Sequence, residues 1–217
     1  MTQPGNSLDD IVRRNDPDRW LSSRFIGDLA ARADVISLYA FDYELSRASR
    51  VTTNPLMGEI RLTWWREVLD EVFLGRAVRA HPTAEALAAV VRRHDLPRGP
   101  LEAMIDGRYR ELDSDPMTPE EALSWALDTA GGAAGLVVRC LDPACPPQAA
   151  EAAGTLWALA RKGHADPQLV RRAKSEAGRL SAAAFPAVAH AALALRPAAS
   201  ELSKRLRLTW AVARGRL

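Results

Sequence analysis

Hydrophobic positions recur along the chain at spacings of three and four residues, which is the period of one face of an α-helix. In the segment 35–47, for example, Leu38, Phe41 and Leu45 share such a face. Prolines punctuate the segments, and the run Thr-Pro-Glu-Glu at 118–121 combines an N-cap, a first-turn proline and a capping acid. Between such breaks the pattern predicts about nine or ten helices and no strand. We therefore expect an all-α helical bundle.

A second strongly periodic helix is expected over residues 55–73. The positions expected to be buried on it are Leu56, Ile60, Trp64, Leu69 and Phe73. Three acids, Glu67, Asp70 and Glu71, share its opposite side. They form either a solvated helix face or a trio of metal ligands, and the solvated face is the interpretation we favour.

Composition places this sequence among globular proteins, with 217 residues, 47% hydrophobic and 26% charged. We expect one domain over residues 1–217, in which 1–15 is a flexible or short helical N-terminus. The chain begins without the pattern of a signal peptide, and no apolar run reaches the length of a membrane span, so a cytoplasmic location is expected. Cys140 and Cys145 lie near no cluster of histidines, and neither a disulfide nor a zinc site is predicted.

Charge is distributed unevenly along the chain. Residues 161–217 contain 12 Lys/Arg and 3 Asp/Glu, whereas residues 1–160 contain 17 and 24. Residues 197–217 are predicted to form a basic amphipathic helix, whose apolar stripe consists of Leu202, Leu206, Trp210, Ala213 and Leu217. Such a helix either packs its stripe into the bundle, which we favour, or lies on an anionic membrane through residues 200–217. No nucleic acid is expected as a partner, because no known binding module accompanies the charge.

The order of several short motifs resembles the squalene/phytoene synthase family. The motifs are Ser23-Arg24-Phe25, Tyr39-Ala40-Phe41, Leu62-Thr63-Trp64-Trp65, Glu111-Leu112 and the small-residue run Ala130-Gly131-Gly132-Ala133-Ala134-Gly135. Small residues in that run let a substrate or another helix approach the backbone closely. The resemblance implies the isoprenoid synthase fold, an all-helical bundle around a central cavity.

The same resemblance shows which residues are missing. Enzymes of this family join two prenyl diphosphates, and the leaving diphosphate is neutralised by magnesium ions that two aspartate-rich motifs hold. The three acidic positions of the first motif read Ser46, Arg47 and Arg50 in this sequence, and of the second motif only Asp166 is acidic. We therefore predict no catalytic residue, no metal ligand and no cofactor. Mg²⁺ would be needed only if the chain were an enzyme after all.

The closest branch of the family by resemblance is non-catalytic and includes a mitochondrial assembly factor for respiratory complex I. The similar runs are Ala40 to Leu45, Leu56-Met57 and Arg92 to Leu96. This implies a pseudoenzyme that binds a protein partner, such as a membrane respiratory complex, and that is cytoplasmic or peripheral on the inner membrane face. The alternative is a prenyltransferase that acts on farnesyl or geranylgeranyl diphosphate, alone or with a partner subunit.

If an isoprenoid ligand binds, the family resemblance places it in the central cavity. The candidate cavity residues are Tyr39, Phe41, Ser46, Arg47, Arg50, Glu111, Gly131 and Gly135. Arg47 and Arg50 either bind a diphosphate directly, by charge-assisted hydrogen bonds, or lie on a solvated or partner-facing helix surface.

Overall fold

The structure is a computed structural model that describes residues 7–50, 54–194 and 200–217. All regular structure in these residues is helical, which confirms the predicted all-α class. The longer helices are α3 (Leu29–Arg50), α4 (Pro55–Phe73), α5 (Pro82–His94), α6 (Arg98–Tyr109), α9 (Gln148–Arg161), α10 (Pro167–Ala177) and α12 (Glu201–Arg214). The shorter ones are α1 (Leu8–Asn15), α2 (Pro17–Ser23), α7 (Pro119–Ala126), α8 (Gly132–Leu141) and α11 (Ala191–Ala194).

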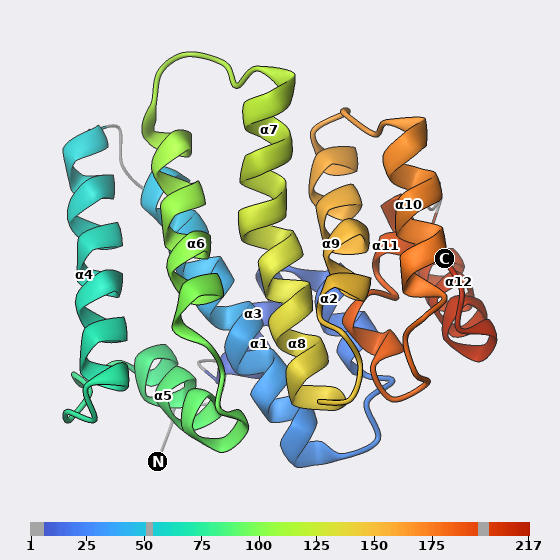
Figure 1. The fold of residues 1–217 in the computed structure, drawn as a ribbon, viewed down its shortest axis with the longest axis horizontal. Helices are drawn as coiled ribbons and strands as arrows, with labels where there is room; N and C mark the ends of the chain where they lie inside the picture. Colours follow the sequence, from blue (N-terminus) through green and yellow to red (C-terminus); the bar gives the residue numbers. More distant parts are fainter. Residues whose placement is uncertain (1–6, 51–53, 195–199) are drawn as a thin grey trace.

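Three short turns complete these elements, namely η1 (Arg110–Leu112), the π-helical turn η2 (Leu127–Gly131) and η3 (Phe185–Ala187). Figure 1 shows α4, α6, α7 with α8, α9 and α10 side by side, with α3 behind them and α12 at the edge opposite α4. No helix within the described part of the chain combines the length and the apolar character of a membrane span.

Helix starts agree with the capping signals in the sequence. Thr118 accepts a hydrogen bond from the backbone N–H of Glu121, and the Glu121 carboxylate accepts one from the Thr118 backbone N–H. This is the predicted capping box. Asp16 and Asp166 cap α2 and α10 with their side chains, which accept hydrogen bonds from the backbone N–H groups of Arg19 and Gln168, and each lies just before a proline. These bonds satisfy amide groups that have no partner within the helix, and the helix start predicted at Thr118 is confirmed.

The core is built around α3. Leu38, Phe41 and Leu45 are fully buried, as their spacing predicts. Phe41 packs edge-on against Trp65 of α4, with ring centroids 5.2 Å apart. An aromatic pair of this geometry adds about 0.5–1.5 kcal/mol to the free energy gained by burial.

The predicted buried face of α4 is wrong in its first half. Leu56 and Ile60 are 57% and 53% exposed, and Trp64 is only partly buried. The residues that α4 buries are instead Leu62, Trp65, Val68, Leu69 and Val72. Both sets have helical spacing, so periodicity alone does not choose between them. Packing against α3 and α6 selects the second set, and Leu56 and Ile60 are left at the surface.

The small-residue run brings helices together. A Cβ atom on Gly154 of α9 would collide with the backbone oxygen of Ala130 in η2. A Cβ on Gly131 would lie 2.8 Å from Thr155 Oγ1, and one on Gly135 would lie 3.4 Å from Pro147 Cβ. Of the two roles predicted for the small residues, close approach of another helix is the one that Gly131 and Gly135 serve.

The C-terminal helix α12 does not bury its predicted stripe. Leu202, Leu206 and Trp210 are 68%, 63% and 61% exposed. The residues that α12 buries are Leu208 and Ala211, which contribute to its packing beside α11 and α2. The prediction that the stripe packs into the bundle is therefore wrong.

Candidate functional site

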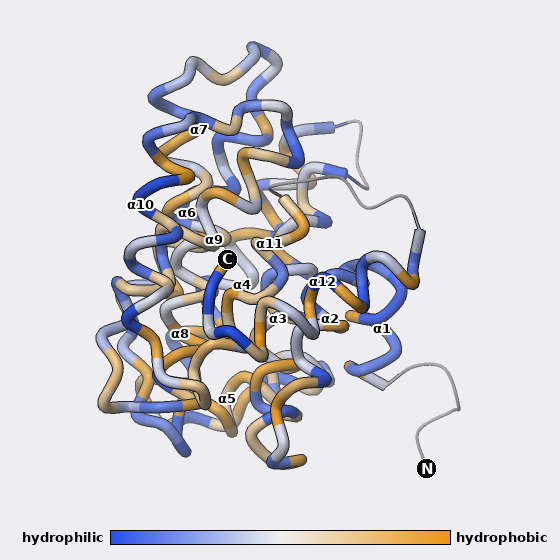
Figure 2. Tube along the Cα trace, turned by 90° about the vertical axis from the view of Figure 1, so that its right-hand side faces the viewer, coloured by the Kyte–Doolittle hydropathy of each residue, from blue (hydrophilic) through white to orange (hydrophobic). Residues whose placement is uncertain are grey.

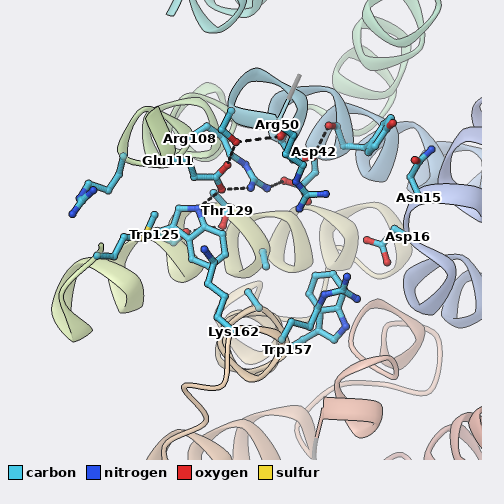
Figure 3. A pocket seen from close by; sticks show the side chains of 18 of the residues that line it. Asn15, Asp16, Asp42, Arg50, Arg108, Glu111, Trp125, Thr129, Trp157 and Lys162 are labelled. Atoms are coloured by element: carbon cyan, nitrogen blue, oxygen red, sulfur yellow. Dashed lines mark hydrogen bonds and ion pairs between the residues drawn. The ribbon is translucent and has the colours of Figure 1, made fainter. Parts of the chain in front are cut away.

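A cavity of about 570 Å³ lies between α3, η1, η2, the start of α2 and the C-terminal end of α9. Figure 3 shows Asp42, Arg108 and Glu111 on one side of this cavity and Trp157 and Lys162 on the other. Its lining contains both cations and carboxylates. The pairing among these charges decides what the cavity is able to bind.

Asp42 lies at the centre of a buried ion-pair network. Its Oδ2 accepts a hydrogen bond of 2.5 Å from Arg19 Nη1, and its Oδ1 accepts one of 2.6 Å from Arg108 Nη2. All three residues are buried. Burial alone would raise the pKa of Asp42, but the attraction of Arg108 and Arg19 outweighs it and lowers the pKa to about 2. The Asp42 carboxylate is therefore ionised and held by two arginines.

The carboxylate of Glu111 in η1 is also held by hydrogen bonds from neighbouring side chains. Its Oε1 accepts hydrogen bonds of 2.6 Å from Arg108 Nη1 and from Trp125 Nε1. Its Oε2 accepts a hydrogen bond of 2.6 Å from Ser49 Oγ. Both carboxylate oxygens are thus engaged by protein donors. Nearer the mouth, Asp113 forms an ion pair of 3.3 Å with Arg110.

Three cations line the remainder of the cavity. Arg161 lies over the ring of Trp157 and 3.6 Å from the Asp18 carboxylate. Lys162 Nζ lies 4.4 Å from the ring centroid of Trp125. Within the described residues, neither Lys162 nor Arg50 has a carboxylate partner. Positive charge at the mouth is therefore only partly neutralised.

The residues present do not fit a magnesium clamp. Within residues 7–50, 54–194 and 200–217, no three His, Cys, Asp or Glu side chains gather as metal ligands would. The acidic trio of α4 also has other partners, since Asp70 pairs with Arg98 and both Glu67 and Glu71 pair with Arg79. These pairs lie at the surface, in agreement with the solvated face that we favoured.

The structure brings together some of the predicted cavity residues and separates others. Ser46, Arg50 and Glu111 line the cavity. Arg47 is 40% exposed and pairs with Glu44 at 3.0 Å. Tyr39 is buried with its ring under Arg19, Phe41 lies in the core, and Gly131 and Gly135 face α9. Ligand binding by any of these residues stays a prediction.

Sequence reasoning missed the residues that form the charged network. It assigned no role to Asp42, Arg19 or Arg108. The sequence signal was an ionisable residue directly after the largely apolar run 35–41 of a predicted helix. A buried charge needs a partner, but only the tertiary fold brings α2 and α6 to it.

A buried aromatic cluster borders the cavity. The His190 ring packs edge-on against Trp157 and Tyr39, with centroids 5.2 and 6.5 Å apart. Among the residues that the structure describes, Tyr39 OH, Trp157 Nε1 and both ring nitrogens of His190 have no hydrogen-bond partner. Burial, together with the positive charges of Arg19 and Arg161, holds the pKa of His190 well below its usual range. His190 is therefore neutral in the folded protein.

Comparison with known families and structures agrees with this architecture. The model of the family "Squalene/phytoene synthase" matches residues 12–163. A crystal structure of a dehydrosqualene synthase in complex with ligand superposes with a TM-score of 0.67 at 16% sequence identity, covering 95% of this chain and 94% of that one. This likeness confirms the isoprenoid-synthase-like fold.

Curated relatives carry the name NADH dehydrogenase (ubiquinone) complex I, assembly factor 6. The Bos taurus protein is 27% identical over 104 residues and the Homo sapiens protein 25% identical over 104 residues, in each case 48% of this chain and 31% of the relative. The Mus musculus protein is 24% identical over 141 residues, which is 64% of this chain and 42% of the relative. The matches thus span less than half the length of these relatives.

Proposed function

Since the chain belongs to the squalene/phytoene synthase family, we propose that it uses the family's fold to bind a partner protein and not to catalyse prenyl transfer. Its task in this proposal is to assist the assembly of a membrane-bound respiratory complex. The observation that carries the proposal is the buried Asp42 carboxylate, which two arginines already neutralise.

Ionising a prenyl diphosphate requires divalent cations beside the leaving group, and such cations need free carboxylates. At the position of the first aspartate-rich motif, α3 presents Ser46, Ser49 and Arg50 to the cavity. The positive charge of Arg50 repels a second cation. For Asp42 to bind a metal, it would have to give up two buried, charge-assisted hydrogen bonds. The electrostatics of the cavity therefore favour an anionic or neutral occupant over magnesium.

A surface for a protein partner is available on α4. Leu56, Met57 and Ile60 are exposed large apolar side chains on its first two turns. Exposed apolar residues that gather on one element are typical of protein interfaces. The likeness to the complex I assembly factors supports the choice of a respiratory complex as the partner.

Deletion of the gene in the organism that encodes this chain tests the proposal. We expect less assembled NADH-oxidising complex in the membranes, measured on native gels, and recovery when the wild-type gene is returned. Leu56→Asp with Ile60→Asp should fail to restore assembly. Leu123→Asp, a change at another exposed leucine, should restore it. Normal assembly in the deletion strain would refute the proposed function.

A second candidate function is metal-free binding of a prenyl diphosphate. It is favoured by Arg50 and Lys162, which line the cavity without a carboxylate partner in the described residues. Titration with farnesyl diphosphate in the presence of a chelator tests it. If the wild-type chain binds and the double variant Arg50→Gln with Lys162→Gln does not, this second function is supported. Equal binding by the variant and the wild-type chain counts against it.

A further inference from the structure

The helix α12 has two apolar faces, of which the bundle covers only one. Leu208 and Ala211 are buried on the side of the bundle. At 3.6 residues per turn, Leu202, Leu206 and Trp210 project from roughly the opposite side of the helix. All three are more than 60% exposed. In Figure 2 hydrophobic and hydrophilic residues alternate along α12. Packing among the described residues therefore does not account for the second face.

Basic residues border this exposed face on both sides. Helical geometry places Arg205 on one side of the stripe, and Arg207 and Arg214 on the other. The guanidinium of Arg214 lies 4.1 Å from the ring centroid of Trp210. Within the described residues, Arg205 and Arg214 have no carboxylate partner, and the single acid of the helix, Glu201, pairs with Lys204. The face is thus apolar at its centre and positive at its edges.

An apolar groove of about 330 Å³ lies beside the stripe, between α2 and α12. Trp20, Phe25 and Leu208 line it, and Arg24 and Arg205 also contribute to it. The apolar surface thus extends beyond one helix onto the neighbouring segment of the bundle. As on the exposed face of α12, the cationic side chains of this groove, Arg24 and Arg205, lie next to apolar side chains.

We propose that α12 docks this protein on an anionic lipid surface. In this arrangement Leu202, Leu206 and Trp210 enter the boundary between headgroups and acyl chains, while Arg205 and Arg214 meet lipid phosphates. A tryptophan in an apolar stripe flanked by arginines is typical of such interfacial helices. A protein partner of ordinary composition would offer no comparable excess of negative charge. Lipid binding is measured without any partner protein, so the proposal stands or falls separately from the assembly function.

Flotation of the full chain with vesicles provides the test. One set of vesicles is phosphatidylcholine alone, and the other contains in addition about one-third phosphatidylglycerol. We expect binding to the anionic vesicles, and Leu206→Asp with Trp210→Asp should lower it at least about tenfold. The matched control, Leu74→Asp with Leu123→Asp, changes two other exposed leucines away from α12 and should leave binding unaltered.

Two further variants separate the charges from the apolar contact. Arg205→Gln and Arg214→Gln should each weaken binding to the anionic vesicles about fivefold, and added salt should weaken it further. Trp210→Phe should bind nearly as well as the wild-type chain but should lose the lipid-induced blue shift of tryptophan emission. Circular dichroism verifies that each variant is folded.

Three results would overturn the proposal. The first is a folded wild-type chain that does not float with anionic vesicles. The second is equal flotation of the wild-type chain and Leu206→Asp with Trp210→Asp. The third is a wild-type dimer that this double change converts to a monomer, because a second copy of the chain would then cover the face.

Discussion

Replacing Asp42 by asparagine removes the one negative charge that Arg19 and Arg108 share in the core. Loss of one partner from a buried ion pair costs about 3–5 kcal/mol, because a charge is left without compensation. The lower end applies here, since Arg108 retains Glu111 at 2.6 Å and Arg19 retains Asp16 at 3.6 Å. For a chain of this length, a loss of ~3 kcal/mol corresponds to a fall in Tm of about 6–12 °C.

Thermal and urea unfolding, followed by circular dichroism, measure this loss. The matched control is Asp106→Asn, which breaks an ion pair with Arg66 whose side chains are 54% and 41% exposed. An exposed pair contributes at most about 1 kcal/mol. If Asp42→Asn and Asp106→Asn lowered Tm equally, the buried network would not be a major source of stability and the reasoning would fail.

The pH dependence of stability provides a second readout of Asp42→Asn. The pKa of Asp42 is about 2 in the folded protein, against a usual value of 3.8. The unfolded chain therefore binds a proton first as the pH falls. Ionisation of Asp42 therefore contributes about 2 kcal/mol to the free energy of unfolding above pH 4, and this contribution is lost as the pH approaches 2. We expect the acid limb of the stability curve to be shallower in the variant than in the wild-type protein.

Three further predictions concern packing and ionisation. Trp65→Ala should lower the free energy of unfolding by about 3–5 kcal/mol and Trp64→Ala by clearly less, since only Trp65 is buried; equal losses in urea unfolding would contradict the assigned face of α4. Gly154→Ala should cost about 1–3 kcal/mol or more, because its Cβ collides with the Ala130 backbone; an unchanged urea midpoint would refute this contact. The pKa of His190 is depressed in the folded protein, so the free energy of unfolding should fall as the pH falls below about 6.5. His190→Phe should reduce this fall between pH 7 and 5. If wild type and variant lost stability with pH at the same rate, His190 would be protonated equally in the folded and unfolded states.

How far the sequence determines the fold can be judged from α3 and α4. In α3 one apolar set dominates, and Leu38, Phe41 and Leu45 are buried as predicted. In α4 two sets have helical spacing, and periodicity does not state which of them faces the bundle. The choice depends on contacts with α3 and α6, which the spacing of residues within α4 does not encode. The same ambiguity explains why the stripe of α12 was placed inside the bundle.

The candidate site was predictable only where a motif marks it. Of the eight cavity residues that the family resemblance indicated, Ser46, Arg50 and Glu111 line the cavity and the other five do not. The network of Asp42, Arg19 and Arg108 joins residues up to 66 positions apart. No local pattern reveals such a pairing. It follows from the fold together with the rule that a buried charge must be compensated.

Diphosphate release from farnesyl and geranylgeranyl diphosphate tests the central claim most directly. The purified chain is incubated with each substrate, with Mg²⁺ and with a chelator, beside an active dehydrosqualene synthase as the positive control. With the Asp42 and Glu111 carboxylates held by arginine, we predict release no faster than in the buffer blank under both conditions. Magnesium-dependent turnover above the blank would show that the cavity does hold metal ions, and the account of a non-catalytic protein would be wrong.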